Sequence, residues 1–156
     1  MTDDPRQYRL PLDDQPEDQE EQSAPNSSLE DLFGPVIHAY TRQQALEDGV
    51  LVDAMQGELA AVSRQHYKWP IAMTASLWGL IQRAVNSPKY VNDLPGVWHD
   101  ILWMSRVGGA EVSPTERRFT VIITGAGRRR NWPLKIVSGP DDEGQPCLTV
   151  MLAGED

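Results

Sequence analysis

The sequence has few of the features that stabilise secreted proteins or anchor proteins in membranes. Its 156 residues include a single cysteine, Cys147, so no disulfide can form within the chain. It contains no apolar run of about 18 residues, the length that a membrane-spanning helix needs, and no basic and apolar leader of the secretory type. We therefore expect a cytoplasmic protein without a membrane segment, and a chain of this length can bury a core without cross-links.

Positive charge is scarce, and the acidic excess lies at one end of the chain. The formal net charge is −9. Residues 1–30 carry nine acidic and two basic side chains, a net charge of −7, whereas residues 31–156 carry 14 acidic and 12 basic side chains, a net charge of −2. Because the first segment is also rich in proline and poor in apolar residues, we predict a disordered acidic leader over 1–30 and a single compact domain over 31–156.

The acidic leader has two interpretations. Its apolar residues Tyr8, Leu10 and Leu12 could form a short docking motif that becomes ordered on a basic partner. A segment that only keeps the protein in solution explains the same composition, and the general behaviour of acidic, proline-rich tails favours it. The sequence by itself does not separate a binding role from a solubilising one.

Cap residues and apolar spacing predict the helices of the first half of the domain. Thr41 and Gln44 have the spacing of a capping box, so a short helix is expected before Gly49, which can adopt the left-handed conformation that ends it. Apolar residues over 52–67 then recur at three- and four-residue intervals, which indicates a second helix despite the interruption at Gly57.

Two longer helices are predicted in the middle of the chain. Thr74 can cap a helix that ends at Asn86, and Asn92 or Asp93 can cap one that ends at Gly108. Both segments are apolar over a wide face, so we expect them to form most of the helical contribution to the core. Their tryptophans are expected in a large aromatic core: Trp78, Trp98 and Trp103.

The last third of the sequence has the period of strands. Apolar and polar residues alternate over 119–124, over 132–137 and over 147–152, and glycine-rich turns separate the three segments. This pattern predicts an antiparallel meander of three strands, to which residues 36–40 could add a fourth strand. The fold class is therefore α+β, with three or four short helices packed on a small antiparallel sheet.

The one dense group of basic residues lies in the meander. Arginine side chains suit phosphate and carboxylate, so nucleic acid, a phosphorylated ligand, an acidic protein or the acidic leader itself could bind there. A solvated hairpin tip is the simpler alternative, and so few charges in a nearly neutral domain do not favour direct binding to nucleic acid. The segment GAG at 125–127 lacks the lysine and hydroxyl of a phosphate loop. The candidate binding residues are Arg128, Arg129, Arg130, a surface-exposed Trp132, Arg117 and Arg118.

No cofactor or metal site is predicted. The three histidines, His38, His66 and His99, are far apart in sequence and lack ligand spacing. The acidic turn at 141–143 does not have the alternating oxygen pattern of a calcium loop. Cys147 falls in an alternating strand, where a small buried side chain is more typical than a nucleophile.

One enzyme class is weighed as the alternative function. The segment around His38 and Tyr40, followed by a short helix, is similar to the opening strand and helix of ADP-ribosyltransferases. That resemblance would give the histidine a contact with a nicotinamide dinucleotide. The later motifs of those enzymes, including a catalytic glutamate in context, are missing from this sequence. A small enzyme or nucleotide-binding domain therefore stays the second hypothesis.

The segments FGPVIHAYTRQQALEDGVLVD and PLKIVSGPDDEGQPCLTVMLAGED, with KWPIAMTASLW between them, carry a wider resemblance. Over residues 33–156 the chain resembles an uncharacterised family of small bacterial, plasmid and phage proteins. The resemblance implies no catalytic residue and a role in mobile-element biology, including interference with a host defence complex. The leading hypothesis is a non-catalytic binding protein that docks onto a host protein or nucleoprotein complex.

Overall fold

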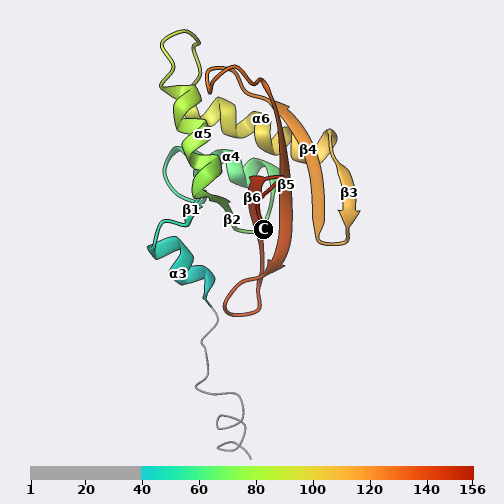
Figure 1. Cartoon of the computed structure of the whole chain (residues 1–156). Coiled ribbons are helices and arrows are strands. Elements are labelled where there is room, and N and C mark those ends of the chain that lie inside the picture. Colours follow the sequence, from blue (N-terminus) through green and yellow to red (C-terminus); the bar gives the residue numbers. More distant parts are fainter. Residues whose placement is uncertain (1–39) are drawn as a thin grey trace, which may run out of the picture. The chain divides into compact units, whose positions relative to one another are not determined.

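The computed structural model describes residues 40–156, which form helices and one mixed sheet (Figure 1). The sheet has six strands in the order β1-β2-β6-β5-β4-β3. The strands are β1 (Leu51–Asp53), β2 (Ile71–Thr74), β3 (Ala110–Ser113), β4 (Glu116–Ile122), β5 (Asn131–Pro140) and β6 (Pro146–Leu152). The helices of this part of the chain are α3 (Arg42–Glu47), α4 (Glu58–His66), α5 (Ala75–Val85) and α6 (Leu94–Val107).

The strand order brings distant parts of the chain together. All neighbouring strands are antiparallel except β2 and β6, which run parallel with Met73 opposite Val150. A parallel pair needs a long crossover connection. Here the connection consists of α5, α6 and three strands, so the sheet is complete only when the last strand is in place.

One face of the sheet carries the core. Helix α5 packs on β2 and β6, α6 packs on β4, and α4 packs along α6 (Figure 1). Strand residues that alternate along β5 and β6 point toward these helices, as their period of two requires. The most deeply buried large side chains include Leu77 and Ile81 of α5, Trp98 and Ile101 of α6, and Leu134 and Val150 of the sheet.

The α+β class, the C-terminal meander and several helix ends are confirmed. Thr41 and Gln44 form the predicted capping box, with the Thr41 hydroxyl accepting from the Gln44 N–H and the Gln44 side chain accepting from the Thr41 N–H. Thr74 caps α5 and Asp93 caps α6 through their side chains. These ends could be predicted because each is specified by residues within one turn.

The predicted helix over 52–67 is wrong in its first half. Residues 51–53 form β1, and the helix α4 begins only at Glu58, after Gly57 with φ +61°. Val52 lies opposite Met73 of β2, so this apolar residue belongs to a pair of strands and not to one face of a helix. Strand β2 itself was not predicted, because all four of its residues are buried and no alternation marks it.

Two further expectations need correction or fall outside the described residues. The side chain of Trp103 is 49% exposed and lies on the surface of α6, so it does not join the aromatic core. The possible strand over 36–40 lies outside the described residues except for Tyr40, which is not part of the sheet. The predicted leader over 1–30 also lies outside them. Within 40–156, no helix has the length and apolar character needed to cross a membrane.

Candidate binding cleft

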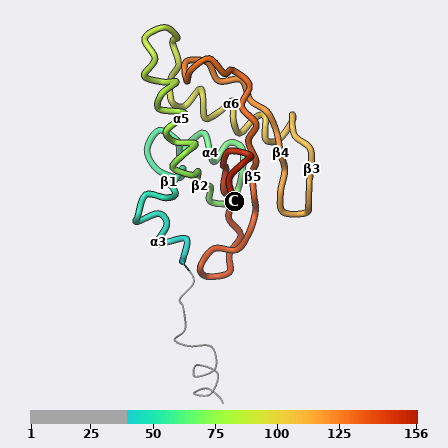
Figure 2. The backbone as a smooth tube through the Cα atoms, in the orientation of Figure 1, coloured from blue at the N-terminus to red at the C-terminus, as the bar shows by residue number. Residues whose placement is uncertain are grey.

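Two loops meet at the end of the sheet where β4 ends and β5 begins. One loop, 86–93, joins α5 to α6, and the other, 123–130, joins β4 to β5; Figure 2 shows them side by side. They border an open cleft of about 360 Å³. Among its described lining residues three are cationic and none is acidic, so we name it the basic cleft. It is lined by Ser87, Lys89, Tyr90, Thr124, Gly125, Gly127, Arg128 and Arg130.

One amide side chain joins the two loops. Asn92 donates to the backbone carbonyl of Thr124 at 2.8 Å and to that of Ala84 at 3.0 Å. Because the side chain is partly buried, these two bonds hold the loops at a defined separation. The basic cleft is therefore supported by the α5–α6 loop as well as by the hairpin.

A glycine allows the loops to approach closely. Gly125 has φ +98°, and a Cβ atom placed on it would lie 3.0 Å from the Cβ atom of Ser87 and 3.1 Å from the carbonyl oxygen of Ala84. A larger residue would push the loops apart as well as strain the backbone. Gly127 also has a positive φ, +102°, but the space around it is open.

Two of the three cations of the cleft, Lys89 and Arg130, lie near Tyr90. The Nζ atom of Lys89 lies 5.5 Å from the centre of the Tyr90 ring. A hydrogen bond from Arg130 and the positive charge of Lys89 lower the pKa of the Tyr90 hydroxyl below its ordinary value. The direction of that shift reports a positive electrostatic environment, which is the environment that attracts an anion.

The third arginine of the hairpin tip has a different role. Arg129 stacks its guanidinium 5.0 Å from the centre of the Trp132 ring and donates from Nε to the Asn131 carbonyl at 3.0 Å. Trp132 is half-buried against the core rather than exposed, because β5 turns it to the face that the helices cover. Its buried Nε1 has no hydrogen-bond acceptor among the described residues. Arg129 and Trp132 thus stabilise the hairpin tip and do not line the basic cleft.

The two other candidate arginines lie away from the cleft. Arg117 donates to the carbonyls of Ser105 and Gly109, both at 3.1 Å, and so satisfies the C-terminal end of α6. Arg118 pairs with Glu116 at 2.7 Å and lies opposite Lys135 in the middle of the sheet. The predicted basic group is therefore divided, with Arg128 and Arg130 alone of the six candidates lining the cleft.

Of the two residues of the enzyme hypothesis, Tyr40 alone belongs to the described part of the chain. His38 lies outside the described residues. Tyr40 donates its hydroxyl proton to the Asp48 carboxylate at 2.7 Å, and this bond raises the pKa of the tyrosine. That contact links the two ends of α3.

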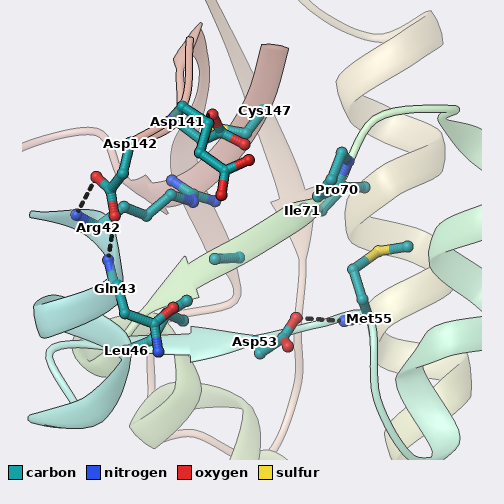
Figure 3. A pocket seen from close by; sticks show the side chains of 12 residues that line it. Arg42, Gln43, Leu46, Asp53, Met55, Pro70, Ile71, Asp141, Asp142 and Cys147 are labelled. Atoms are coloured by element: carbon teal, nitrogen blue, oxygen red, sulfur yellow. Dashed lines mark hydrogen bonds between the residues drawn. The ribbon is translucent and has the colours of Figure 1, made fainter. Parts of the chain in front are cut away.

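A second cleft, of about 420 Å³, lies between α3, the strands β1 and β2, and the turn between β5 and β6 (Figure 3). Its polar groups hold the structure together. The Asp142 carboxylate accepts from the backbone N–H groups of Arg42 and Gln43, both at 2.9 Å, and so caps α3 from the far end of the chain. Asp53 accepts from the N–H of Met55 at 2.8 Å. These bonds give Asp142 and Asp53 structural roles.

The lone cysteine lies at the base of the second cleft. Cys147 is buried, as predicted, and burial raises the pKa of its thiol despite the nearby positive charge of Arg42. The Arg42 guanidinium itself donates to the Thr149 hydroxyl and to the Leu148 carbonyl, both at 2.8 Å. A protonated thiol beside an engaged arginine is not an activated nucleophile.

Two histidines that are far apart in sequence meet between α4 and α6. Nε2 of His66 lies 3.0 Å from Nδ1 of His99, and the His99 ring stacks on Trp103. Burial, His99 and the nearby Arg106 together lower the pKa of His66. No third histidine, cysteine or carboxylate of residues 40–156 joins them in a metal-binding group.

The residues that sequence reasoning missed come from the α5–α6 loop. Ser87, Lys89 and Tyr90 lie more than 30 residues before the arginine hairpin in sequence, yet they line the same cleft. A serine, a lysine and a tyrosine between two helices carry no signal of their own. The tertiary structure brings them together, with the Asn92 bond to Thr124 joining the two loops.

Comparison with known proteins gives a family and no activity. The model of a family of unknown function, DUF6573, matches residues 31–156. No curated protein and no solved structure matches the chain. The resemblance drawn from the terminal motifs is thus confirmed at the level of an uncharacterised family. The match spans most of the chain, and the chain therefore belongs to the family of unknown function DUF6573.

Proposed function

We propose that this protein is a non-catalytic binding protein that docks an anionic group of a partner protein into the basic cleft. The observation that carries the proposal is the convergence of Lys89, Arg128 and Arg130 on one cleft with no described acidic residue in its lining. Outside that cleft, the described residues carry 13 acidic and nine basic side chains, so the positive charge of the cleft is local. A local positive site of this kind steers and orients an acidic partner.

The arrangement of the other polar groups favours binding over catalysis. In the second cleft Asp142 caps a helix and Asp53 caps a turn, the arginine is engaged, and the thiol is protonated. The basic cleft contains no described carboxylate or histidine that could serve as a general base. Binding is the chemistry that these groups can perform as they are placed.

The cellular setting is part of the same proposal. The resemblance to plasmid and phage proteins suggests a cytoplasmic protein of mobile-element origin that acts on a host protein or nucleoprotein complex, an anti-defence role included. The three candidate arginines outside the cleft are engaged: Arg117 at the end of α6, Arg118 by Glu116 and Arg129 on the Trp132 ring. Binding along a nucleic acid backbone, which needs several successive phosphate contacts, is therefore not favoured.

The proposal is tested by partner capture with a matched control. Full-length protein is compared with a variant carrying Lys89→Ala, Arg128→Ala and Arg130→Ala, and with Arg64→Ala, which removes an exposed arginine from α4. A partner retained by the wild type and the control, lost by the triple variant and then bound as a purified protein supports docking through the cleft. Equal retention by all three would place the interface elsewhere.

A further inference from the structure

We infer that the anion held in the basic cleft is a phosphate monoester, either on a side chain of the partner protein or on a free small molecule. The inference rests on the proposed function, whose site it shares, and adds the chemical class of the ligand. It is carried by the way two loops together provide the parts of a phosphate cradle.

The glycine-containing loop offers its backbone. The N–H of Ile123 donates to the carbonyl of Arg130 at 2.9 Å, which is the last bond between the two strands. None of the backbone N–H groups of residues 124–130 donates to an acceptor among the described residues. Gly125 and Gly127, both with positive φ, turn this backbone along the cleft wall. Successive free amides in such a turn are a recurring anion-binding arrangement.

The facing loop provides what the segment GAG lacks by itself. A phosphate loop needs a lysine and a hydroxyl beside its glycines, and here Lys89 and Ser87 line the opposite wall of the same cleft. The Oγ atom of Ser87 accepts from the backbone N–H of Lys89 at 3.3 Å, and its own proton has no acceptor among the described residues. The two parts of the cradle are thus separate in sequence and adjacent in space.

The number and kind of the donors favour phosphate over carboxylate. The residues that line the cleft from both loops carry two guanidinium groups, one ammonium group and a hydroxyl, and the glycine-containing loop adds backbone amides that have no acceptor among the described residues. A carboxylate has two oxygens in one plane and a single charge. A phosphate monoester has three terminal oxygens in a tetrahedral arrangement and about −1.5 to −2 charges at neutral pH, which matches three cations and donors from both loops.

The same reasoning separates a monoester from a diester. The phosphate of a nucleic acid backbone is a diester with one charge, and a strand presents such groups in series. The cations of the meander do not continue from the cleft as a track, because Arg117 and Arg118 are engaged elsewhere. One doubly charged group fits this local group of three cations better than a series of singly charged ones.

Binding is measured by titrating full-length, ¹⁵N-labelled protein at constant ionic strength. Inorganic phosphate, phosphoserine and adenosine 5′-monophosphate test the shared chemistry, and dimethyl phosphate and acetate serve as the singly charged controls. We expect the backbone amide signals of residues 124–130 to shift with the first three ligands. The two controls should bind at least about tenfold more weakly. Equal affinity for acetate and phosphate, or shifts confined to other residues, would overturn the inference.

Variants locate the site. Lys89→Met, Arg128→Gln and Arg130→Gln should each weaken phosphate binding by about tenfold, whereas Arg64→Gln on α4 should leave it unchanged. Gly127→Ala keeps every cation and has open space for its methyl group. A weaker affinity of this variant for phosphate, with an unchanged far-ultraviolet circular dichroism spectrum, would therefore report the contribution of the backbone. Unchanged binding in all three cation variants would contradict the inference.

The source of the monoester and the docking proposal are distinguished by the same experiments. A phosphoserine peptide that binds more tightly than phosphoserine assigns the group to a protein side chain, and tighter binding of the mononucleotide assigns it to a small molecule. If no phosphate compound binds but partner capture still depends on Lys89, Arg128 and Arg130, the docking proposal stands and the phosphate inference falls. If phosphate binds and no partner is captured, the phosphate inference stands and the docking proposal falls.

Discussion

Asn92 and Thr124 are joined across 32 residues of sequence by a hydrogen bond of 2.8 Å from the Asn92 amide to the Thr124 carbonyl. The same amide donates to Ala84 at the end of α5. One side chain thus connects a helix end, a helix–helix loop and a hairpin tip. The shape of the basic cleft depends on Asn92 even though this residue is not among those that line the cleft.

Replacing Asn92 should destabilise the domain. Asn92→Ala removes two hydrogen bonds from partly buried carbonyls, so we expect the free energy of unfolding to fall by about 1–3 kcal/mol. Denaturant unfolding of the two proteins measures the difference. The exposed Asn131→Ala, which removes an amide side chain at the start of β5, should cost much less. Equal losses in the two variants would show that the bridge contributes nothing.

Gly125 and Gly127 form a matched pair for separating backbone strain from steric conflict. Both have positive φ, but only at Gly125 would an added Cβ atom meet neighbouring atoms, at 3.0 and 3.1 Å. Each substitution to alanine should cost about 1 kcal/mol for the left-handed backbone, and Gly125→Ala should cost about 1–3 kcal/mol more for the contact. Thermal and denaturant unfolding test this order, which a larger loss at Gly127 would contradict.

The buried pair Ser63 and Trp98 links α4 to α6. The indole Nε1 of Trp98 donates to the Ser63 hydroxyl at 2.8 Å, and that hydroxyl donates to the Ala54 carbonyl at 2.7 Å. Both residues are fully buried. Ser63→Ala leaves a buried indole N–H and a carbonyl without a partner, so we expect a loss of about 1–3 kcal/mol.

A double-mutant cycle isolates the bond between them. Trp98→Phe removes the indole donor and some packing, and in that background Ser63→Ala should cost less than it does in the wild type. The free energies of unfolding of the four proteins give the coupling. A coupling of zero would mean that the Ser63 effect comes only from its bond to Ala54.

The His66–His99 pair predicts a pH dependence of stability. Burial, together with the charges of His99 and Arg106, lowers the pKa of His66 in the folded protein, whereas the unfolded value is about 6.5. The unfolded chain therefore binds more protons between the two pKa values. Stability should be full above about pH 6.5 and decline as the pH falls through the folded pKa.

The measurement is the free energy of unfolding between about pH 5 and pH 7.5 for the wild type and for His66→Gln. The wild type should lose stability toward low pH more steeply than the variant, since glutamine does not titrate. Parallel curves would show that other groups control the pH dependence. An NMR titration of the His66 ring gives the folded pKa directly.

Asp142 stabilises α3 from a distance. Its carboxylate accepts from the first two N–H groups of the helix and places a negative charge at the helix N-terminus. Asp142→Ala should cost about 0.5–2 kcal/mol and increase amide exchange in α3 more than in α5. The neighbouring Glu143→Ala is the control. Unchanged exchange in α3 would show that the Thr41 capping box suffices.

The sequence could predict the parts of this fold that nearby residues specify. The caps at Thr41, Thr74 and Asp93 each depend on contacts within one turn, and the alternation in β4 follows from the burial of one face of that strand. It failed at β2, where burial on both faces removes the alternation, and at Val52, whose partner Met73 is 21 residues away.

The candidate site divides in the same way. The arginine-rich turn with its glycines can be predicted from the sequence, because a hairpin tip and its charges are local properties. The sequence does not show which arginines line a cleft. Arg128 and Arg130 line one together with Lys89 and Tyr90. Arg117 instead caps α6, and Arg129 stacks on Trp132. The amino-acid order by itself determined the elements and the chemistry of single residues. Only the tertiary structure decided which of them meet, because long-range strand pairing and the Asn92 bridge set those distances.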